Sequence, residues 1–289
     1  MIRPSDAVCR IARSPAVETF DLDVGIVYTH ERQWMGPLVS TLKASADRVD
    51  TRLILVDNDS DEGVDSWRYV VPETLVLHNS TRLGYAANLN RILTAATARY
   101  VLLMNTDMFF DPRQQCLARM IEFMDAHPGC GLAGCRLLHA DGNDARAARR
   151  FQNLPIILAR RLGLGRVMPS TLDRYFYREH DIHDSFDCDW LSGCFMMIRR
   201  EAFEQVGLFD ESFGKYFEDV DMCLRMARNG WRVMYCGGTS CYHIEQRASQ
   251  NLFSADAWRH VRAYLYWLNK WGYASHRQAV PPLQAVTTV

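Results

Sequence analysis

Acidic side chains occur in two widely separated segments, at positions that could support catalysis. In the first segment, Asn105-Thr106-Asp107 follows an apolar run from Tyr100 to Met104. Five consecutive apolar residues are typical of a strand buried on both faces, so we expect Asp107 just past the carboxyl end of a strand. Open α/β sheets bind their ligands at that edge. A turn or a helix cap is the alternative explanation for this carboxylate.

The second segment, Glu218-Asp219-Val220-Asp221, begins a predicted helix. Apolar residues recur there at the spacing of one helical face: Val220, Cys223, Leu224 and Ala227. Asp221 has a structural explanation, because it lies in the first helical turn and has Arg225 as its i+4 partner. Adjacent carboxylates repel each other, so Glu218 and Asp219 are harder to explain in this way. They are candidates for a general base.

Asp107 and His243 are candidate ligands of one divalent cation, because both follow strand-like runs whose ends could converge. Two protein ligands are enough when a diphosphate supplies further oxygens, which is how Mg²⁺ usually binds. An imidazole also tolerates Mn²⁺. A structural role for a histidine at a strand end is the alternative.

Other polar residues could bind a nucleotide. Asp57 ends the apolar run that begins after Arg52. Its carboxylate could accept a hydrogen bond from the N3–H of a uracil or thymine ring, or it could form an Asx turn. Asn88 and Asn90 could contact the nucleotide or cap local turns.

A basic segment and an aromatic segment could also contribute to a site. Arg146, Arg149 and Arg150 could pair with phosphates, although an exposed basic turn is an equally good explanation. The segment from Trp190 to Gly193 could form one wall of an acceptor site, or Trp190 could simply belong to the core.

The elements that must position these residues alternate between strand and helix in the first half of the chain. The predicted elements are strands at 22–28, 52–56, 74–78 and 100–104, and helices at 34–48, 84–99 and 113–127. This alternation predicts a mostly parallel sheet covered by helices.

The pattern changes in the second half of the chain. The predicted elements are strands at 131–138, 190–199 and 231–236, a short helix at 201–206, the helix of the second acidic segment, and a final helix at 255–273. Residues 152–186 have no clear periodicity, and we expect an irregular loop there.

Bulk composition excludes several classes of protein. With 289 residues and a formal net charge of -1, the chain has no global field that would favour nucleic acid. Nine cysteines, an odd number, suit reduced thiols in a cytoplasm better than a disulfide framework. No stretch reaches the ~18 to 20 apolar residues that span a bilayer. We therefore expect a cytoplasmic protein that is soluble or attached to a membrane only at its surface.

A series of segments follows one order along the chain: 56–60, 83–90, 103–107, 148–151, 190–203, 206–211 and 216–225. In this order the segments resemble family 2 glycosyltransferases of the GT-A fold, and most of all their bacterial rhamnosyltransferase branch. The resemblance covers about residues 22–273. It implies an α/β, Rossmann-like, mostly parallel sheet flanked by helices, with a small mixed sheet at the acceptor side and a C-terminal helix.

The resemblance also implies a division of the chain. Residues 1–21 would be an N-terminal extension, and residues 22–254 would be the GT-A domain. Within that domain, a nucleotide-sugar half would extend over about 22–130 and an acceptor half over about 131–254. A C-terminal helix and tail would follow at 255–289.

By this resemblance, Asp107 is the last acid of the family's Asp-x-Asp metal motif, His243 completes the metal site, and Asp219 is the base, with Glu218 beside it. Asp57 reads the pyrimidine. The implied donor-binding residues are Tyr28, Thr29, Asp57, Arg82, Gly84, Asn90, Asn105, Thr106, Asp107, Arg150 and Arg247. The implied acceptor-binding residues are Trp190, Ser192, Gly193 and Glu218.

The chain departs from the family pattern at three places. Asn105 replaces the first acid of Asp-x-Asp, as is common in this branch. Tyr28-Thr29-His30 stands where Thr-Tyr-Asn is expected, at the position of a nucleotide contact. His243 is not followed by a glycine-containing turn, so Arg247 could supply a phosphate contact instead.

The resemblance implies an inverting, Mg²⁺- or Mn²⁺-dependent transferase. It would move L-rhamnose from dTDP-rhamnose to a glycan or lipid-linked glycan in bacterial surface polysaccharide synthesis. The alternatives are another UDP-, GDP- or dTDP-sugar as donor, or a non-catalytic module that binds nucleotide sugars or glycans. A nucleotidyltransferase is disfavoured, since Thr29 to Arg32 is not a glycine- and arginine-rich phosphate loop.

The final predicted helix combines aromatic and basic residues, which suits contact with the inner membrane at its cytoplasmic face. Packing of its rings on the catalytic domain is the alternative. In a mixed arrangement, one face packs while Trp267 or Trp271 touches lipid. The cations involved would be Arg259, Arg262 and Lys270.

Overall fold

The computed structural model describes residues 20–69, 71, 73–161, 166–244 and 255–272. Most of the expected N-terminal extension, Arg247 and the C-terminal tail lie outside the described residues.

A nine-stranded sheet forms the centre of the molecule, in the order β3-β2-β1-β4-β10-β6-β11-β5, with β8 paired to β11. Its strands are β1 (Leu22–Tyr28), β2 (Thr51–Asp57), β3 (Thr74–His78), β4 (Tyr100–Met104), β5 (Met108–Phe109), β6 (Cys130–Leu138), β8 (Phe186–Asp187), β10 (Phe195–Arg199) and β11 (Arg232–His243).

The first four strands are parallel, as the alternation of strands and helices predicts. Every residue of β4 is buried, because helices cover both faces of this part of the sheet. In the register of β1 and β2, Tyr28 lies opposite Asp57. The carboxyl ends of these strands therefore place Tyr28, Asp57 and Asn105 at one edge of the sheet.

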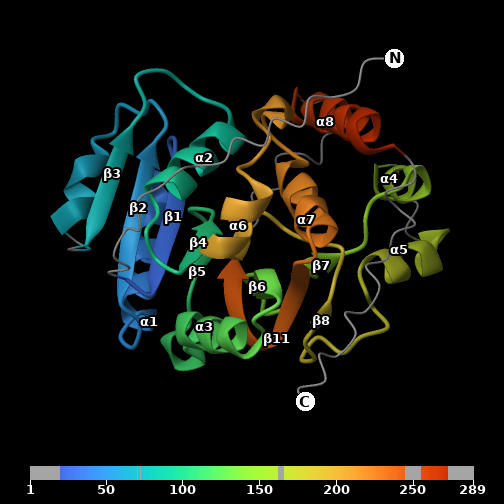
Figure 1. Ribbon diagram of the computed structural model, residues 1–289, viewed down its shortest axis with the longest axis horizontal. Helices are drawn as coiled ribbons and strands as arrows, with labels where there is room; N and C mark the ends of the chain where they lie inside the picture. The colour runs from blue at the N-terminus through green and yellow to red at the C-terminus, as the bar shows by residue number, and fades with distance from the viewer. Residues whose placement is uncertain (1–19, 70, 72, 162–165, 245–254, 273–289) are drawn as a thin grey trace.

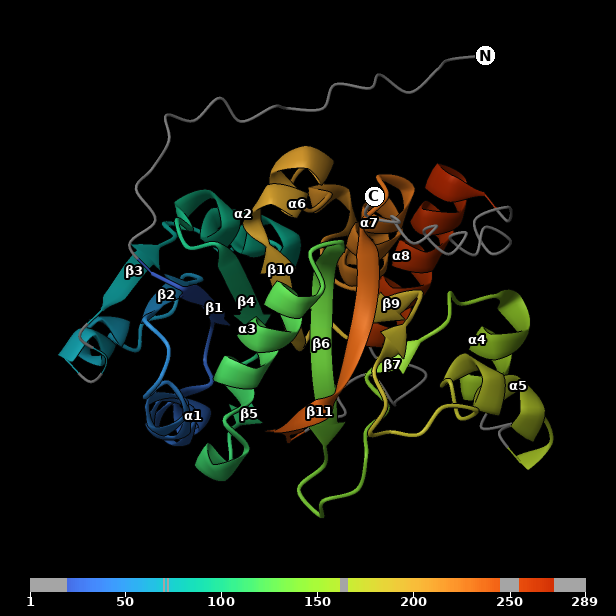
Figure 2. The same cartoon turned by 60° about the horizontal axis from the view of Figure 1, so that its bottom comes forward.

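The second half of the chain continues the same sheet in mixed orientation. Strand β10 is antiparallel to both β4 and β6, whereas β11 runs parallel to β6. A separate two-stranded antiparallel sheet consists of β7 (Ala148–Arg149) and β9 (Trp190–Leu191). Figure 2 shows β7 and β9 to one side of β6 and β11.

Helices cover both faces of the central sheet (Figure 1), and Figure 2 shows α1 and α3 on one face and α2 and α6 on the other. The α-helices on the two faces of the sheet are α1 (Arg32–Ser45), α2 (Tyr85–Ala95), α3 (Cys116–Ala126), α6 (Arg200–Val206) and α7 (Glu218–Arg228). Helix α8 (Ala255–Trp271) lies beside α7. Short 3-10 turns are η1 (Val64–Tyr69), η2 (Pro112–Gln114) and η4 (Glu211–Phe213).

The prediction of an irregular loop over 152–186 is wrong. This segment contains two helices, α4 (Leu154–Arg161) and α5 (Pro169–Tyr175), which pack against each other. A helix of two turns is too short to give a clear 3.6-residue period in the sequence. Both helices carry proline near their first position, where the missing N–H has no consequence.

Two strand boundaries also differ from the prediction. The expected strand at 190–199 is split into β9 and β10 by a turn at 192–194. Strand β11 continues beyond residue 236, although the strand is predicted to end there, before Gly237-Gly238. The register shifts between Cys236 and Ser240, so the two glycines form part of a bulge inside the strand. This longer strand extends to His243.

Candidate active site

The end of β11 brings His243 to Asp107. The pair His243–Met108 belongs to the antiparallel ladder between β11 and β5, and the N–H of Ile244 donates to the carbonyl of Asp107 at 3.0 Å. As a result, His243 Nε2 lies 3.4 Å from Asp107 Oδ1, with both side chains largely buried. The two residues proposed to share a cation are therefore brought together.

The donor set of this pair fits a divalent cation that obtains further oxygens elsewhere. Without a cation, burial disfavours a charged His243, but the neighbouring Cys194 and Asp107 side chains raise its pKa to about 10, so a bound cation would have to displace the imidazole proton. In the described part of the chain, no group of three metal-ligating side chains occurs. An imidazole and one carboxylate would thus hold a cation whose other ligands come from a diphosphate and water.

The second acidic segment begins α7 after a strained turn. Tyr216 and Phe217 both have positive φ angles, 74° and 69°, a conformation that is costly for bulky side chains. The backbone N–H of Gly193 donates to Asp219 Oδ2 at 3.0 Å, and that of Val220 donates to Oδ1 at 2.8 Å. The carboxylate of Asp219 is thereby fixed beside the turn that follows β9.

The two adjacent carboxyl groups have different environments. Glu218 is buried, its Oε2 has no hydrogen-bond partner in the part of the chain that the structure describes, and burial together with the charge of Asp219 raises its pKa to about 8. Burial also raises the pKa of Asp219, but the N–H groups of Gly193 and Val220 oppose that rise. Near neutral pH, Glu218 therefore keeps its proton and Asp219 is the residue suited to act as a base.

Tyr85 connects the metal-binding pair to the acidic pair. Its hydroxyl donates to Asn105 Oδ1 at 3.1 Å, and its backbone N–H donates to the carbonyl of Gly214 at 2.8 Å. Burial first, and then the surrounding carboxylates of Glu218, Asp219 and Asp107, raise the pKa of its phenol. Sequence reasoning missed Tyr85, although its position at the start of α2, directly after Gly84, could have indicated it.

Asp57 lies at the edge of the sheet where the parallel strands end, and both of its carboxylate oxygens have polar partners. The N–H of Ser60 donates to Oδ1 at 3.0 Å, three residues on rather than the two of an Asx turn, and His78 Nδ1 lies 3.0 Å from Oδ2. Burial alone would raise the pKa of Asp57, but these bonds outweigh it and lower the pKa. Asp57 is therefore an anion, and its contact with a pyrimidine stays a prediction.

The other expected donor-binding residues surround this edge. Tyr28 donates its hydroxyl to Glu62, and the N–H of Thr29 donates to Glu31 at 2.8 Å. Thr106 is buried beside Asp107, whereas Arg82 and Gly84 are exposed on the loop before α2.

The amide of Asn90 has structural partners. Its Nδ2 donates to the carbonyl of Phe209 at 2.9 Å, and its Oδ1 accepts from the N–H of Phe209 at 2.8 Å. Buried Asn88 accepts from Asn79 and donates to the carbonyl of Gly84. The two amides hold α2 in place, and a nucleotide contact by Asn90 stays a prediction.

The three arginines of the basic segment point in different directions. Arg150 lies over the ring of Tyr177, donates to the carbonyl of Arg174 and pairs with Glu179. Arg146 pairs with Asp144 at 3.5 Å. Of the three, Arg149 is the one whose charge acts on Asp219.

The expected acceptor wall combines a core residue with a polar turn. Trp190 is buried and donates its indole N–H to the carbonyl of Arg150 at 2.8 Å. The N–H of Ser192 donates to the carbonyl of Ala147 at 3.3 Å, which ties the turn to the start of β7. Through this turn, Gly193 reaches Asp219.

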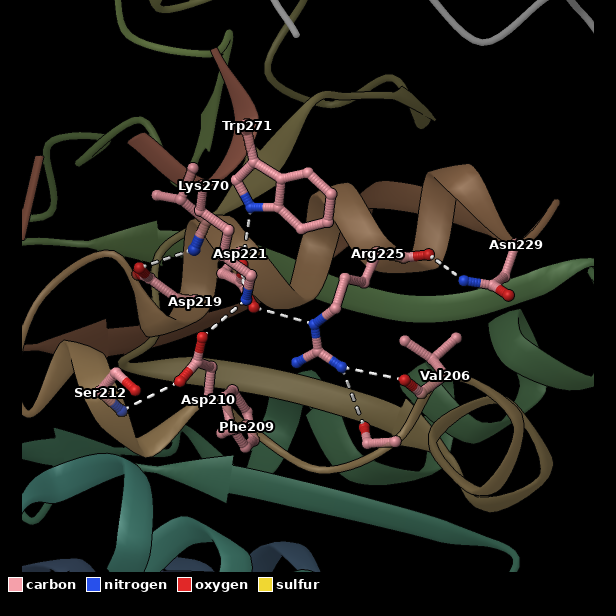
Figure 3. A network of polar contacts seen from close by, with 12 residues as sticks. Val206, Phe209, Asp210, Ser212, Asp219, Asp221, Arg225, Asn229, Lys270 and Trp271 are labelled. Atoms are coloured by element: carbon pink, nitrogen blue, oxygen red, sulfur yellow. Dashed lines mark hydrogen bonds and ion pairs between the residues drawn. The ribbon is translucent and has the colours of Figure 1, made fainter. Parts of the chain in front are cut away.

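Helix α8 is attached to α7 by a buried polar network (Figure 3). Asp221 is fully buried and accepts hydrogen bonds of 2.8 Å from Arg225 and from the indole N–H of Trp271. Lys270 bridges Asp221 and Asp210, at 2.8 Å and 2.7 Å. The predicted i+4 pair of Asp221 with Arg225 is confirmed.

This network contradicts the expectation that Trp267 or Trp271 touches lipid. Trp267 has no exposed surface, and Trp271 and Lys270 are engaged with Asp221. The large apolar side chains that α8 exposes are Trp258, Val261 and Leu265. None of the described helices is long and apolar enough to cross a bilayer.

Comparison with known proteins decides the family. The model of glycosyl transferase family 2 matches residues 23–207. The chain belongs to glycosyltransferase family 2. The predicted family and enzyme class are thereby confirmed.

Two curated members of this family illustrate its branch. The chain is 28% identical over 226 residues to an N-acetylglucosaminyl-diphospho-decaprenol L-rhamnosyltransferase of Mycobacterium tuberculosis, covering 72% of each protein. It is 26% identical over 277 residues to the O-antigen biosynthesis protein RfbC of Myxococcus xanthus, covering 90% of this chain and 20% of that protein. A family 2 glycosyltransferase of the rhamnosyltransferase-like branch is thus supported.

Solved structures confirm the GT-A fold. A structure of GalNAc-T7 with UDP, GalNAc and Mn²⁺ matches with a TM-score of 0.62 and 15% identity, covering 91% of this chain and 52% of the other. This glycosyltransferase therefore spans about half of that chain. The mannosyltransferase PcManGT from Pyrobaculum calidifontis, in complex with GDP-Man and Mn²⁺, matches with a TM-score of 0.56 and 17% identity, covering 92% of this chain and 75% of the other.

Proposed function

We propose that this family 2 glycosyltransferase inverts configuration at the anomeric carbon, using Asp219 as its single base. The observation that carries the proposal is the buried phenol of Tyr85, which is close enough to Asp107 and to the Glu218–Asp219 pair to feel the charge of all three carboxylates. A donor diphosphate at the Asp107–His243 pair would place its sugar toward the Glu218–Asp219 pair. A displacement in one step needs one base, whereas a retaining glycosidase needs two carboxylates ~5 Å apart.

Asp107 and His243 would hold the divalent cation, Mg²⁺ or Mn²⁺. When bound, the cation neutralises the leaving diphosphate. The protein's own residues orient the reaction. Asp219, fixed by Gly193 and Val220, takes the proton of the attacking hydroxyl, and protonated Glu218 adds no second negative charge near neutral pH.

The proposed donor is dTDP-rhamnose, and the proposed acceptor is a glycan or lipid-linked glycan of a bacterial surface polysaccharide. The name of the similar Mycobacterium tuberculosis protein, an L-rhamnosyltransferase acting on a diphospho-decaprenol, supports both choices. Asp57 as a pyrimidine reader would suit the base of dTDP or UDP, from whose N3–H it could accept a hydrogen bond.

A lipid-linked acceptor favours contact with the inner leaflet of the membrane through α8. The exposed stripe of Trp258, Val261 and Leu265 lies at i, i+3 and i+7, with exposed Arg262 beside it. The rings of His260 and Phe217 are 5.2 Å apart, so this helix also lies next to the turn that begins α7. An interfacial position of α8 would present the proposed base to a lipid-linked acceptor.

A panel of dTDP-, UDP- and GDP-sugars tests the function. Thermal shift with Mn²⁺ identifies the bound donor, and released nucleotide is then measured with candidate acceptors. Release of dTDP from dTDP-rhamnose is expected. Binding of a donor without any release of nucleoside diphosphate would instead indicate a non-catalytic module, and release from another sugar would overturn the rhamnose assignment.

A further inference from the structure

Arg149 has a side chain that its structural contacts do not fully explain. Its Nε is completely buried and has no hydrogen-bond partner among the described residues. An unpaired buried donor is destabilising, and more so when it is charged, so it calls for an explanation. Neighbouring Arg150, in contrast, has a ring contact, a carbonyl acceptor and a carboxylate.

The alternation of side chains along a strand separates the two arginines. Arg149 ends β7, and successive residues of an extended chain point to opposite sides. In the ladder with β9, Arg149 lies directly opposite Trp190, and its guanidinium is 4.9 Å from the centre of that ring. Trp190 thus orients the cation by a cation–π contact.

The same ladder leads to the proposed base. Three residues after Trp190, the N–H of Gly193 donates to Asp219 Oδ2. Helix α7, which carries Asp219, packs against β9. Arg149 and Asp219 are therefore both held by β9 and the turn after it, and Arg149 is close enough for its positive charge to act on the carboxylate.

We propose that Arg149 is a positioning residue for the base. Its guanidinium, stacked on the ring of Trp190, keeps the Asp219 carboxylate charged and directed toward the acceptor. This inference rests on the proposed role of Asp219. It also assigns the basic segment a role beside the acceptor, in place of the expected phosphate contact by Arg150.

Several other ionisable groups lie around Asp219, and none of them replaces the positive charge of Arg149. Buried Glu218 precedes it, and Tyr85 and Cys223 are close enough to feel its charge. Lys215 acts on Glu218. On α7 and α8, the cations Arg225 and Lys270 are engaged with Asp221. Burial raises the pKa of Asp219, so loss of Arg149 should raise it further.

The test compares three variants across pH: Arg149→Gln, Arg149→Lys and Arg150→Gln. Arg149→Gln should move the acidic limb of the kcat/KM profile upward by about one pH unit, as expected for a carboxylate that loses a nearby cation. Arg149→Lys keeps the charge and should largely restore the limb. Arg150→Gln should lower the melting temperature and leave the limb in place.

A second measurement does not depend on turnover. The ¹³Cγ chemical shift of Asp219, assigned with Asp219→Asn, should titrate at higher pH in Arg149→Gln than in the wild type. An unmoved carboxyl titration, or a rate that falls equally at every pH, would overturn the role of Arg149. If the wild type transfers no sugar, the proposed function fails, and the carboxyl titration still decides whether Arg149 acts on Asp219.

Discussion

The backbone N–H of Gly193 holds Asp219 Oδ2 at 3.0 Å, so a turn between two strands fixes the carboxylate at the start of a distant helix. The second oxygen accepts from Val220 at 2.8 Å. Both hydrogen bonds favour the charged form of Asp219, which is the form that a base requires.

Asp219→Asn should lower turnover by about 100-fold or more, because an amide cannot take the proton from the acceptor hydroxyl. Donor binding, measured by thermal shift with Mn²⁺, should survive. One of the two backbone bonds is also lost, since the amide has a single accepting oxygen. Turnover close to that of the wild type would remove Asp219 from the role and leave Glu218 as the candidate.

Removal of the divalent cation should abolish transfer. EDTA is expected to stop the release of nucleotide, and added Mn²⁺ or Mg²⁺ should restore it, because the diphosphate would otherwise leave without a counter-charge. His243→Ala should weaken Mn²⁺ binding, measured by electron paramagnetic resonance, whereas His127→Ala, which changes a histidine bonded to the carbonyl of Phe123, should not. Full activity in EDTA would contradict the cation site.

Glu218→Gln should stabilise the protein in a defined pH range. In the unfolded chain Glu218 ionises near 4.5, whereas burial and Asp219 raise its folded pKa to about 8. Between these values only the unfolded state loses the proton, so the residue lowers stability as the pH rises. The melting temperature of Glu218→Gln should exceed that of the wild type increasingly from about pH 4.5 to about pH 8. An equal difference at every pH would contradict the raised pKa.

Asp221→Asn should cost about 3 kcal/mol in the free energy of unfolding, because it leaves two cations without their buried counter-charge. Urea unfolding provides the measurement. Asp187→Asn is the matched control: its partner Arg232 also lies 2.8 Å away, but the side chain of Asp187 is 58% exposed, so a cost below about 1 kcal/mol is expected. Equal costs for the two variants would show that burial of the network is unimportant.

Weak binding to anionic vesicles is expected, and it should decrease as salt is added. The double change of Trp258→Ser and Arg262→Gln should reduce flotation with the vesicles. Arg119→Gln changes an arginine elsewhere on the molecule, bonded to the carbonyl of Gly238, and should not reduce flotation. Absence of binding even at low salt would remove the membrane contact and favour a soluble acceptor.

The strands in the first half of the chain are the part of the fold that the sequence predicts best. The runs at 22–28 and 100–104 have these same bounds as strands, because helices cover both faces of the sheet there, and the run at 74–78 matches the edge strand β3. The order of the strands in the sheet is harder to predict from the sequence. Strand β10 lies between β4 and β6 although it follows both in the chain, and no local pattern indicates that pairing.

The site was predictable where a residue follows a buried strand. Asp107 and His243 were placed in this way, and β11 brings them together. The side chains that surround the proposed base were harder to assign. Arg149 and Arg150 are adjacent and identical in type, and only the register of β7 with β9 decides which one lies against Trp190. Likewise, the sequence of α8 does not reveal that Trp271 points inward.

The contact between α8 and α7 also affects how this protein folds while the ribosome is still synthesising it. Trp271 follows its partner Asp221 by 50 residues. At about 5–20 residues per second, those residues take several seconds to synthesise. During that interval Asp221 has Arg225 but neither Lys270 nor Trp271, so the helix that carries the proposed base is incompletely anchored. The nascent transferase is therefore most exposed to proteases and chaperones at the segment on which its chemistry depends.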